Sequence, residues 1–511
     1  MQSFHYGVDV LSRFLFIIAI TYYLATTLQW YNYSFYRIIA KHHKFAWHVY
    51  YFFVPVVCFV VFYPFYDGLL FYLYCFFIML PLSFLWYQQR DKKLVWTRRV
   101  VRLFLCIIVL FIACEIIVTK TIDYGVPQHL FLFVPLVLGM LCSMFYEAMA
   151  FRIYAMRARR KLLNMSNLTI IAITGSYGKT SIKNLIYQLI KNDFQAYATP
   201  RSVNTYKGLV ADINTCLPKD TQVYIAEAGA RNRGDIEQIS HLLCQHYGVI
   251  SKIGKAHIEY FKNIETTVQT KFELCYSPRL KKIFVQKDNP IPVLKKKTFS
   301  LVPLRFGRES TSQCHVENRI SYPCEIRNQT STLDGISFEM RIDSDWVFFE
   351  TSLLGRFTID NIIVAVLLAR ELGIAIPKIQ HYVKNLVPVP HRLCKIVTPH
   401  KIILDDSFNG NFEGMSEAIA LASLHKGRKV IVTPGLVEYD EASNIALCKQ
   451  IDNVFDIAII TGSLNAELFD SHICNTDKIF IKDKSLLESV LARTGANGDL
   501  VLFANDAPNY I

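Results

Sequence analysis

The sequence predicts a bundle of about five transmembrane helices, followed by a central α/β domain with a glycine-rich loop and then a smaller α/β domain. Three observations lead to this fold class. Apolar residues are concentrated in the first third of the chain, short β-branched runs alternate with helical stretches from Leu168 onward, and a glycine-rich turn follows the first of these runs. A chain of 511 residues with 52% hydrophobic and only 19% charged residues is too apolar to be one ordinary soluble domain. We expect the domains to span residues 1–161, 162–388 and 389–511.

Five apolar runs in the first third are each close to the roughly 20 residues that cross a bilayer as a helix. They cover residues 10–28, 46–66, 69–86, 101–118 and 130–149. A cleaved signal peptide is the alternative interpretation of the first run. Four more apolar segments follow it and no small-residue cleavage site is evident, so we interpret the first run as a retained transmembrane helix.

The distribution of basic residues predicts the orientation of these helices, because Lys and Arg gather in cytoplasmic loops. Basic residues are frequent after the first, third and fifth helices and almost missing from the two intervening turns. The N-terminus is then outside, and everything after Arg152 is cytoplasmic. The net charge of +13 follows from these membrane-flanking clusters, so we do not expect nucleic acid as a partner.

Cysteine usage agrees with a cytoplasmic position of the two α/β domains. Five of the thirteen cysteines lie within the apolar runs, and no two cysteines form a C-x-x-C pair. We therefore expect reduced thiols rather than disulfides or a zinc site.

The region after Leu168 has the pattern of a parallel α/β architecture. Between Lys281 and Asp345 the pattern is less regular and includes alternating segments such as residues 336–342, which we expect to be antiparallel. A change of composition near His391 indicates the second domain boundary. The expected strands of the parallel sheets are residues 169–173, 222–225, 248–253, 401–404, 429–432, 457–461 and 478–481.

The string T-G-S-Y-G-K-T-S at residues 174–181 lies between an expected strand and a helical stretch, which is the context of a phosphate-binding loop. Its glycines let the backbone approach phosphate oxygens, Lys179 can reach the β and γ oxygens, and Thr180 can hold Mg²⁺. The standard G-x-x-x-x-G-K-[ST] spacing requires glycine where Ile173 stands, so an alternative class of P-loop is indicated. An ordinary glycine turn is the alternative interpretation. The nucleotide-binding residues we expect here are Gly175, Ser176, Gly178, Lys179, Thr180 and Ser181.

Further strings follow the loop in a fixed order, and together they resemble the ATP-dependent Mur ligases, most closely the type that adds D-alanyl-D-alanine to the peptidoglycan stem peptide. The resemblance covers about residues 165–511 and is carried by more than the P-loop. The strings are S-V-N-T-Y-K-G (202–208), A-E-A-G-A-R-N-R-G-D-I (226–236), K-I-G-K-A-H-I-E (252–259), T-K-F-E-L (270–274), P-H-R-L (390–393) and D-D-S-F-N-G-N (405–411).

This resemblance implies a Mur-ligase-like fold for both α/β domains and an ATP-dependent carboxylate-amine ligase. The carboxylate takes the γ-phosphoryl group, and an amine then attacks the acyl phosphate to leave an amide, ADP and phosphate. It also implies Mg²⁺ ligands at Thr180, Glu227 and His257, and catalytic roles for Lys179, His257 and Lys271, the last as a carbamylated lysine. Each of three residues has an alternative interpretation. Glu227 is then a surface carboxylate at a strand end, His257 has a structural role, and Lys271 is an unmodified lysine in a salt bridge.

Four more residues match nucleotide contacts of the family: Asn204 near the γ-phosphate, Asn361 at the adenine, Arg392, and Asp406 at the ribose. Each has a helix, turn or linker residue as its alternative interpretation. Asp406 is favoured because it belongs to a polar cluster directly after an apolar strand. Thr205 and Tyr206 follow Asn204, where Mur ligases of the type most resembled usually have Asn-Glu. This difference lies at the edge of the expected site that faces the phosphate and the substrate.

The membrane helices stand where soluble Mur ligases of this type carry a domain that holds the UDP-sugar. We therefore expect a multi-pass protein of the bacterial inner membrane whose partners are the lipid bilayer, a peptide or glycan-peptide acceptor that is lipid-linked, and an amino acid or dipeptide as amine donor. Two alternatives stay open. One is a polymerising ligase related to poly-γ-glutamate synthases, and the other is a non-catalytic ATP-binding membrane scaffold.

Overall fold

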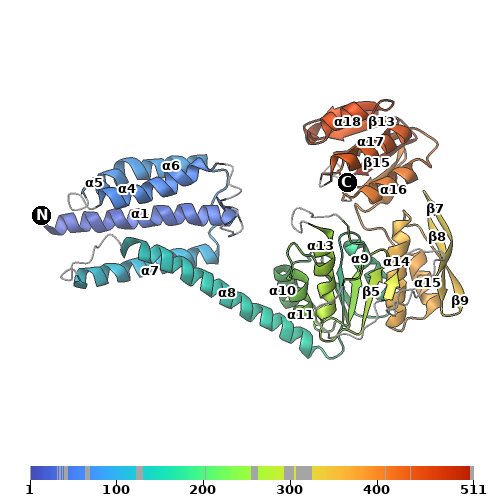
Figure 1. Cartoon of the computed structure of the whole chain (residues 1–511), viewed down its shortest axis with the longest axis horizontal. Helices are drawn as coiled ribbons and strands as arrows, with labels where there is room; N and C mark the ends of the chain where they lie inside the picture. The colour runs from blue at the N-terminus through green and yellow to red at the C-terminus, as the bar shows by residue number, and fades with distance from the viewer. Residues whose placement is uncertain are drawn as a thin grey trace. The chain divides into compact units, whose positions relative to one another are not determined.

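The computed structural model describes residues 2–31, 33, 36, 38–39, 44–63, 69–121, 131–201, 203–254, 263–292, 304–306, 325–408, 410–437 and 439–506. The chain forms two compact units, Met1–Ile153 and Tyr154–Ile511. Figure 1 shows that the first consists of helices and that the second combines sheets with helices.

Four helices of the described residues are long and apolar enough to cross a membrane: Gly7–Trp30, Leu69–Gln89, Arg98–Val118 and Phe133–Asn164. A shorter apolar helix covers Ala46–Phe62. These five helices correspond to the five predicted runs. Because the helix at Ala46–Phe62 is shorter than the other four, the number of five transmembrane helices stays a prediction. The last helix extends well past the predicted end of its run and carries the basic residues that follow it. The elements are α1 (Gln2–Trp30), α3 (Ala46–His48), η1 (Val49–Phe53), α4 (Val54–Phe62), α5 (Leu69–Tyr74), η3 (Cys75–Met79), α6 (Leu80–Gln89), α7 (Arg98–Thr121) and α8 (Phe133–Asn164).

Two of the apolar helices contain a π-helical turn just before a proline. The N–H of Val54 bonds to the carbonyl of Val49, and the N–H of Leu80 bonds to that of Cys75. Pro55 and Pro81 follow these turns and lack the N–H that a regular α-helical ladder needs. The wider turns therefore let each helix continue past its proline.

The central sheet of the second unit is parallel, with strand order β2-β3-β1-β4-β5-β6. Its strands are rich in Ile and Val, and β1 is buried from Ile170 to Thr174, because helices cover both faces. In Figure 1, α10, α11 and α13 lie on one side of the sheet, and α9 and α14 on the other. The strands are β1 (Thr169–Thr174), β2 (Ala196–Ala198), β3 (Val223–Glu227), β4 (Tyr247–Ile250), β5 (Lys282–Gln286) and β6 (Leu304–Phe306). The helices are α9 (Lys179–Ile190), α10 (Tyr206–Thr215), α11 (Asp235–Leu243), α13 (Ile264–Phe272) and η6 (Glu273–Tyr276), with α14 (Phe357–Glu371) and α15 (Ile376–Lys384) later in the chain.

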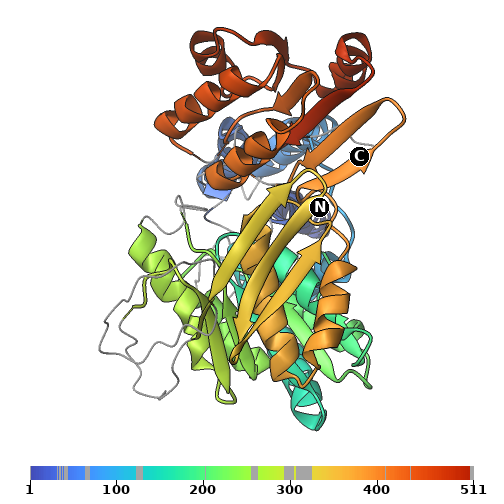
Figure 2. The same cartoon turned by 90° about the vertical axis from the view of Figure 1, so that its right-hand side faces the viewer.

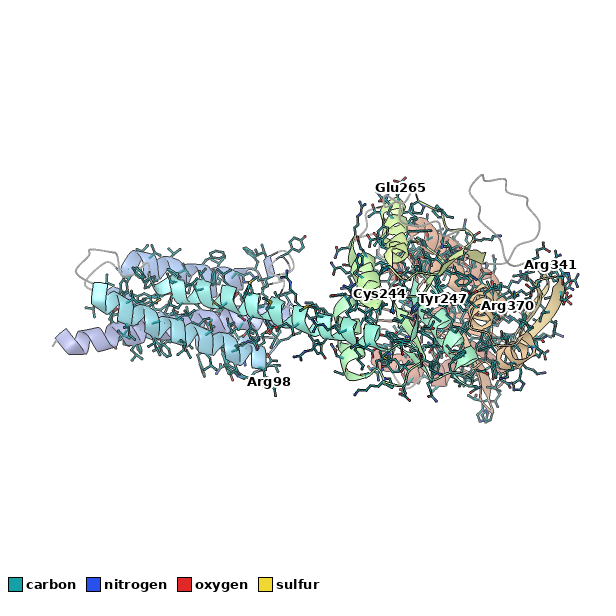
Figure 3. All side chains as sticks on the ribbon, turned by 90° about the horizontal axis from the view of Figure 1, so that it is seen from below. Arg98, Cys244, Tyr247, Glu265, Arg341 and Arg370 are labelled. Atoms are coloured by element: carbon teal, nitrogen blue, oxygen red, sulfur yellow. The ribbon has the colours of Figure 1, made fainter. Side chains whose placement is uncertain are left out.

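Three antiparallel strands, β7 (Ile326–Thr332), β8 (Gly335–Ile342) and β9 (Asp345–Thr351), form a separate sheet beside α14 and α15, as Figure 2 shows. This confirms the antiparallel prediction for residues 336–342. Alternate side chains of β8 are buried, and they join the core formed by β1, α9 and α14. Arg370 of α14, labelled in Figure 3, forms an ion pair of 2.5 Å with Asp343 in the turn after β8.

The last sheet has the order β10-β11-β15-β12-β13-β14, and all of its neighbouring pairs are parallel except β10 with β11. Its strands are β10 (Cys394–Val397), β11 (Lys401–Asp406), β12 (Lys429–Thr433), β13 (Ile457–Thr461), β14 (Asp477–Ile481) and β15 (Asp499–Ala504). Its helices are α16 (Phe412–Ala422), α17 (Glu441–Val454), α18 (Ala466–His472), η7 (Lys484–Leu486) and α19 (Leu487–Thr494).

All seven predicted strands occur, and the parallel arrangement is confirmed for them. The predicted extent of one of them is wrong. The strand expected at residues 248–253 ends at Ile250, because the next residues leave the sheet to contact the glycine-rich loop.

Candidate active site

The glycine-rich loop joins β1 to α9, and its glycines adopt backbone angles that other residues disfavour. Gly175 has φ +145° and Gly178 has φ +80°. A Cβ atom on Gly175 would lie 2.0 Å from the Oγ of Ser251, so the neighbouring strand end leaves no room for a side chain. Gly178 caps α9, which begins at Lys179 and directs its free N–H groups and positive dipole end at the loop. The loop therefore has the geometry of an anion site.

The residues after β4 hold this loop in place. The Oγ of Ser251 donates to the carbonyls of Thr174 (3.1 Å) and Tyr177 (2.5 Å). The carbonyl of Lys252 accepts the N–H groups of Ser176 (3.0 Å) and Tyr177 (3.1 Å). β1 and β4 are neighbours at the point where the strand order reverses, which is where ligands bind in open parallel sheets.

Thr180, Glu227 and Asn204 form a polar cluster behind the loop. Glu227 is the last residue of β3 and is only 2% exposed. Its Oε2 accepts the hydroxyl of Thr180 at 2.9 Å, and its Oε1 accepts the amide of Asn204 at 3.1 Å. Neighbouring oxygens of an octahedral Mg²⁺ site lie about 2.9 Å apart, so the hydroxyl and carboxylate oxygens fit two ligands of this metal, with phosphates and waters as the others.

His257, the third predicted metal ligand, lies outside the described residues. Among the residues that the structure does describe, no group of three or more His, Cys, Asp or Glu side chains is placed to hold a metal ion. Of the described residues, Thr180 and Glu227 are placed to hold a Mg²⁺ ion, and a nucleotide would add phosphate oxygens, which is the usual pattern for Mg²⁺ bound with phosphates.

Lys183, one turn after Lys179, is a buried cation that the sequence analysis did not single out. It is 2% exposed and donates to the carbonyls of Thr199 (2.8 Å) and Arg201 (2.5 Å). Its Nζ lies 3.6 Å from the Oε2 of Glu227. Burial lowers the pKa of Lys183, and the carboxylate of Glu227 opposes that shift. Lys183 follows Lys179 by four residues, which places both on the same face of α9, and this spacing was the only feature of the sequence that pointed to Lys183.

The two predicted catalytic lysines lie close enough for their charges to interact. Lys179 donates to the carbonyls of Gly175 (2.9 Å) and Ser176 (3.0 Å), and burial lowers its pKa while Glu227 opposes the shift. Lys271, on α13, is 4% exposed. Its pKa falls to about 7, chiefly through burial and then through the positive charge of Lys179.

A cavity of about 780 Å³ collects most of the predicted residues. It opens where the carboxyl ends of β1, β3, β4 and β5 face those of β11, β12 and β15. The amide of Asn361 also lies against the loop, because a Cβ on Gly178 would be 3.2 Å from its Oδ1. Lys271 and Gly175 do not line the cavity. The predicted residues that line it are Ser176, Gly178, Lys179, Thr180, Ser181, Asn204, Glu227, Asn361, Arg392 and Asp406.

The last sheet contributes Arg392 and Asp406 through a hydrogen-bonded turn. Asp405, at the end of β11, accepts from His391 (2.8 Å) and from the hydroxyl of Ser407 (2.7 Å). This arrangement leaves the next residue, Asp406, at the cavity. Burial lowers the pKa of Arg392, and the carboxylates of Asp406 and Glu227 oppose that shift.

A contact between two tyrosine hydroxyls joins the glycine-rich loop to the last sheet. The OH of Tyr177 lies 2.6 Å from the OH of Tyr439, which follows β12, and both residues line the cavity. Nothing in the sequence identified this pair, because the glycine-rich pattern does not specify the residue at position 177 and the partner is 262 residues away.

We expect Tyr177→Phe and Tyr439→Phe each to raise the KM for ATP by about two- to tenfold, because one hydrogen bond contributes about 0.5–1.5 kcal/mol. Steady-state ADP release gives these values. The double variant should resemble either single variant, because the contact is lost only once. Fully additive effects would show that the two hydroxyls act separately.

Three comparisons relate this chain to known proteins. Residues 173–369 match the Mur ligase middle domain. A UDP-N-acetylmuramoyl-tripeptide--D-alanyl-D-alanine ligase of Buchnera aphidicola subsp. Baizongia pistaciae is 25% identical over 342 residues, which cover 64% of this chain and 72% of the relative. The protein of the same name from Bacillus subtilis is 23% identical over 348 residues, with 65% and 72% covered.

Among solved structures, MurF ligase from Thermotoga maritima in complex with ADP is similar to this chain, with a TM-score of 0.58 and 22% identity. The match covers 70% of this chain and 80% of that protein. At this identity the likeness establishes a shared fold.

Proposed function

We propose that this chain, which belongs to the Mur ligase family and is MurF-like, is a membrane-bound ligase that forms an amide bond on a cell-envelope precursor at the cytoplasmic face. It is an ATP-dependent enzyme that forms C–N bonds. The proposed acceptor is the carboxylate of a peptide or glycan-peptide of peptidoglycan type. The proposed donor is the amine of an amino acid or dipeptide.

The cavity between the two parallel sheets is the observation that carries this proposal. One sheet supplies the loop, Lys179, Thr180 and Glu227, and the other supplies Arg392 and Asp406. A nucleotide held from both sides brings the sheets together over the reacting groups. Such closure excludes water from an acyl phosphate, which water would otherwise hydrolyse.

The proposed reaction has two steps. A carboxylate oxygen of the acceptor attacks the γ-phosphorus of ATP, the bond to the β–γ bridging oxygen breaks, and ADP leaves. The donor amine then attacks the acyl carbon, phosphate leaves, and the amine gives up a proton to complete the amide. Phosphoryl transfer depends on positioning and on neutralising charge, which Lys179 and Arg392 provide from opposite walls. Thr180 and Glu227 would hold Mg²⁺, which when bound would supply further positive charge at the phosphates.

We propose that Lys271 acts as a carbamate. Its neutral amine combines with CO₂ to form a carbamate and release a proton, which converts a cation into an anion. A pKa of about 7 supports this, because the amine of Lys271 is then uncharged in about half of the molecules near neutral pH. The change would also replace repulsion between Lys271 and Lys179 with attraction.

The membrane helices support a lipid-linked acceptor. The match to the Mur ligase middle domain begins at residue 173, soon after the last apolar helix ends at Asn164. The relatives are named for substrates linked to UDP. An enzyme fixed at the membrane surface can instead meet a precursor whose sugar-peptide head is attached to a lipid. We propose the inner membrane, with an outside N-terminus, as its location.

ADP release by detergent-purified protein with Mg²⁺-ATP tests the proposal. Lipid-linked and nucleotide-linked precursors should be compared at equal concentration, each with a panel of amino acids and dipeptides that begins with D-alanyl-D-alanine. We expect turnover to require both an acceptor and an amine, and the product to gain the mass of the amine less water. Lipid-linked acceptors should have the higher kcat/KM.

Product length separates this function from the polymerising alternative, because a polymerising ligase adds its amine repeatedly to one product. Equal activity on soluble and lipid-linked precursors would contradict the lipid-linked acceptor. ATP binding with no turnover across the whole panel would favour the scaffold alternative over a ligase.

A further inference from the structure

The N-terminal unit contains an open groove of about 320 Å³ toward the ends of α1 and α6. Apolar and aromatic side chains form nearly all of its lining. Tyr22 and Tyr23 come from the later part of α1, and Trp86 and Tyr87 from the last turn of α6. The aromatic side chains that line it are Tyr22, Tyr23, Tyr51, Phe84, Trp86 and Tyr87.

Trp86 gives this groove a buried hydrogen-bond donor. Its side chain is 3% exposed, and its ring packs against those of Tyr23 (centroids 5.0 Å apart) and Tyr51 (6.0 Å). Within the described part of the chain, its Nε1 has no hydrogen-bond partner. A buried N–H without an acceptor is unfavourable, and an oxygen of a bound molecule would satisfy it.

Arg90 places a positive charge beside the groove. It directly follows α6, and its guanidinium carbon lies 3.6 Å from the centroid of the Tyr87 ring and 5.9 Å from that of Tyr22. No carboxylate of the described residues forms an ion pair with it. Lys44 differs in this respect, because its Nζ lies 2.9 Å from Asp91. The groove thus combines an apolar surface with a cation that an anionic group can approach.

We propose that this groove binds the phosphate-proximal part of a single-chain lipid to which the acceptor is linked, with the phosphate at Arg90 and an oxygen of the head near Trp86. The proposal rests on the proposed function, which supplies the lipid-linked acceptor. A groove of this size fits a segment of one chain, whereas a phospholipid brings two acyl chains to its phosphate. Arg90 also belongs to the basic connection that the charge pattern places on the cytoplasmic side, where the head of the acceptor must lie.

Binding of a labelled polyprenyl monophosphate without sugar or peptide tests the groove directly. The full-length protein is placed in nanodiscs of phosphatidylcholine and titrated with this lipid, and separately with phosphatidylglycerol. We expect the polyprenyl phosphate to bind more tightly. Arg90→Gln should weaken it about fivefold, as expected for one basic group at a membrane surface. Trp86→Phe keeps an aromatic ring but removes the donor, and should weaken binding about two- to tenfold.

Arg98→Gln is the matched control. Arg98 is an exposed arginine at the start of α7 that does not line the groove, and Figure 3 shows it pointing away from the helices. Arg98→Gln removes one positive charge, as Arg90→Gln does, and both residues lie on the same predicted side of the membrane. Binding in this variant should stay within about twofold of wild type, because its charge acts only through the general surface potential.

Three results would overturn the groove assignment: equal affinity for both lipids, an effect of Arg98→Gln as large as that of Arg90→Gln, or a dimer of this chain whose formation blocks lipid binding. ADP release separates this failure from that of the proposed function. If turnover on lipid-linked acceptors is unchanged in Arg90→Gln, the groove is refuted and the ligase stands. In the opposite case, Arg90→Gln and Trp86→Phe weaken lipid binding as expected, but no pair of acceptor and amine gives turnover. The groove then stands and the ligase is refuted.

Discussion

Lys179→Ala should lower ADP release by at least about 10²–10³-fold at saturating ATP, because removing one preorganised charge from a phosphoryl-transfer site has an effect of this size. The side chain is buried at the start of α9 and lines the same cavity as Thr180, Glu227 and Arg392. We expect the variant to fold as the wild type does, because Lys179 lies outside the apolar helices. Thermal unfolding and gel filtration of the purified variant check this.

Lys191→Ala is the control for this variant. Lys191 is an exposed lysine that caps the opposite end of the same helix. Its loss should leave ADP release within about twofold of wild type, because exposed substitutions away from special features have small effects. Wild-type turnover in Lys179→Ala would show that the glycine-rich loop does not hold the transferred phosphate.

The sequence predicted the parts of the site that depend on local pattern. The loop glycines and Lys179 follow a short β-branched run, so the strand-turn-helix unit could be predicted and is confirmed, while the phosphate role of the loop stays a prediction. The position of Glu227 at the end of an apolar strand could be predicted in the same way, whereas its predicted role as a Mg²⁺ ligand came from the family resemblance. Residues fixed by local backbone geometry can be inferred from a single segment.

Contacts between distant segments could not be inferred in this way. The strand predicted at residues 248–253 was too long, since Ser251 and Lys252 leave the sheet to bond the loop, and only the adjacency of β1 and β4 reveals this. Lys183 appears in the sequence as an ordinary helix lysine, but folding brings it to Glu227 from a neighbouring element. Tyr177 and Tyr439 meet only because the two sheets face each other.

Activity should also depend on CO₂ and rise with pH through about 7, in step with deprotonation of Lys271. Only the neutral amine reacts with CO₂. At a fixed concentration of dissolved CO₂, the neutral fraction should rise about tenfold between pH 6 and pH 8. The carbamate, and kcat with it, should rise by at least this factor until Lys271 is fully carbamylated, because each carbamate formed from the neutral amine releases a further proton. An ordinary lysine with a pKa of about 10.4 would be neutral in about one molecule in 2,500 at pH 7. The lowered pKa would therefore make the proposed carbamylation accessible at neutral pH.

A carbon-13 NMR spectrum of the protein in labelled bicarbonate reports the carbamate independently of turnover. Its signal should be present in wild type and in Lys191→Ala, and missing from Lys271→Ala and Lys271→Arg. Both Lys271 variants should lose most ADP release, because arginine keeps the positive charge but cannot become an anion here. Full activity of Lys271→Arg would mean that the position needs a cation, and the salt-bridge interpretation would replace the carbamate. Activity that does not depend on CO₂, together with no carbamate signal, would lead to the same conclusion. Burial would then lower the pKa of Lys271 without any reaction of its neutral amine with CO₂.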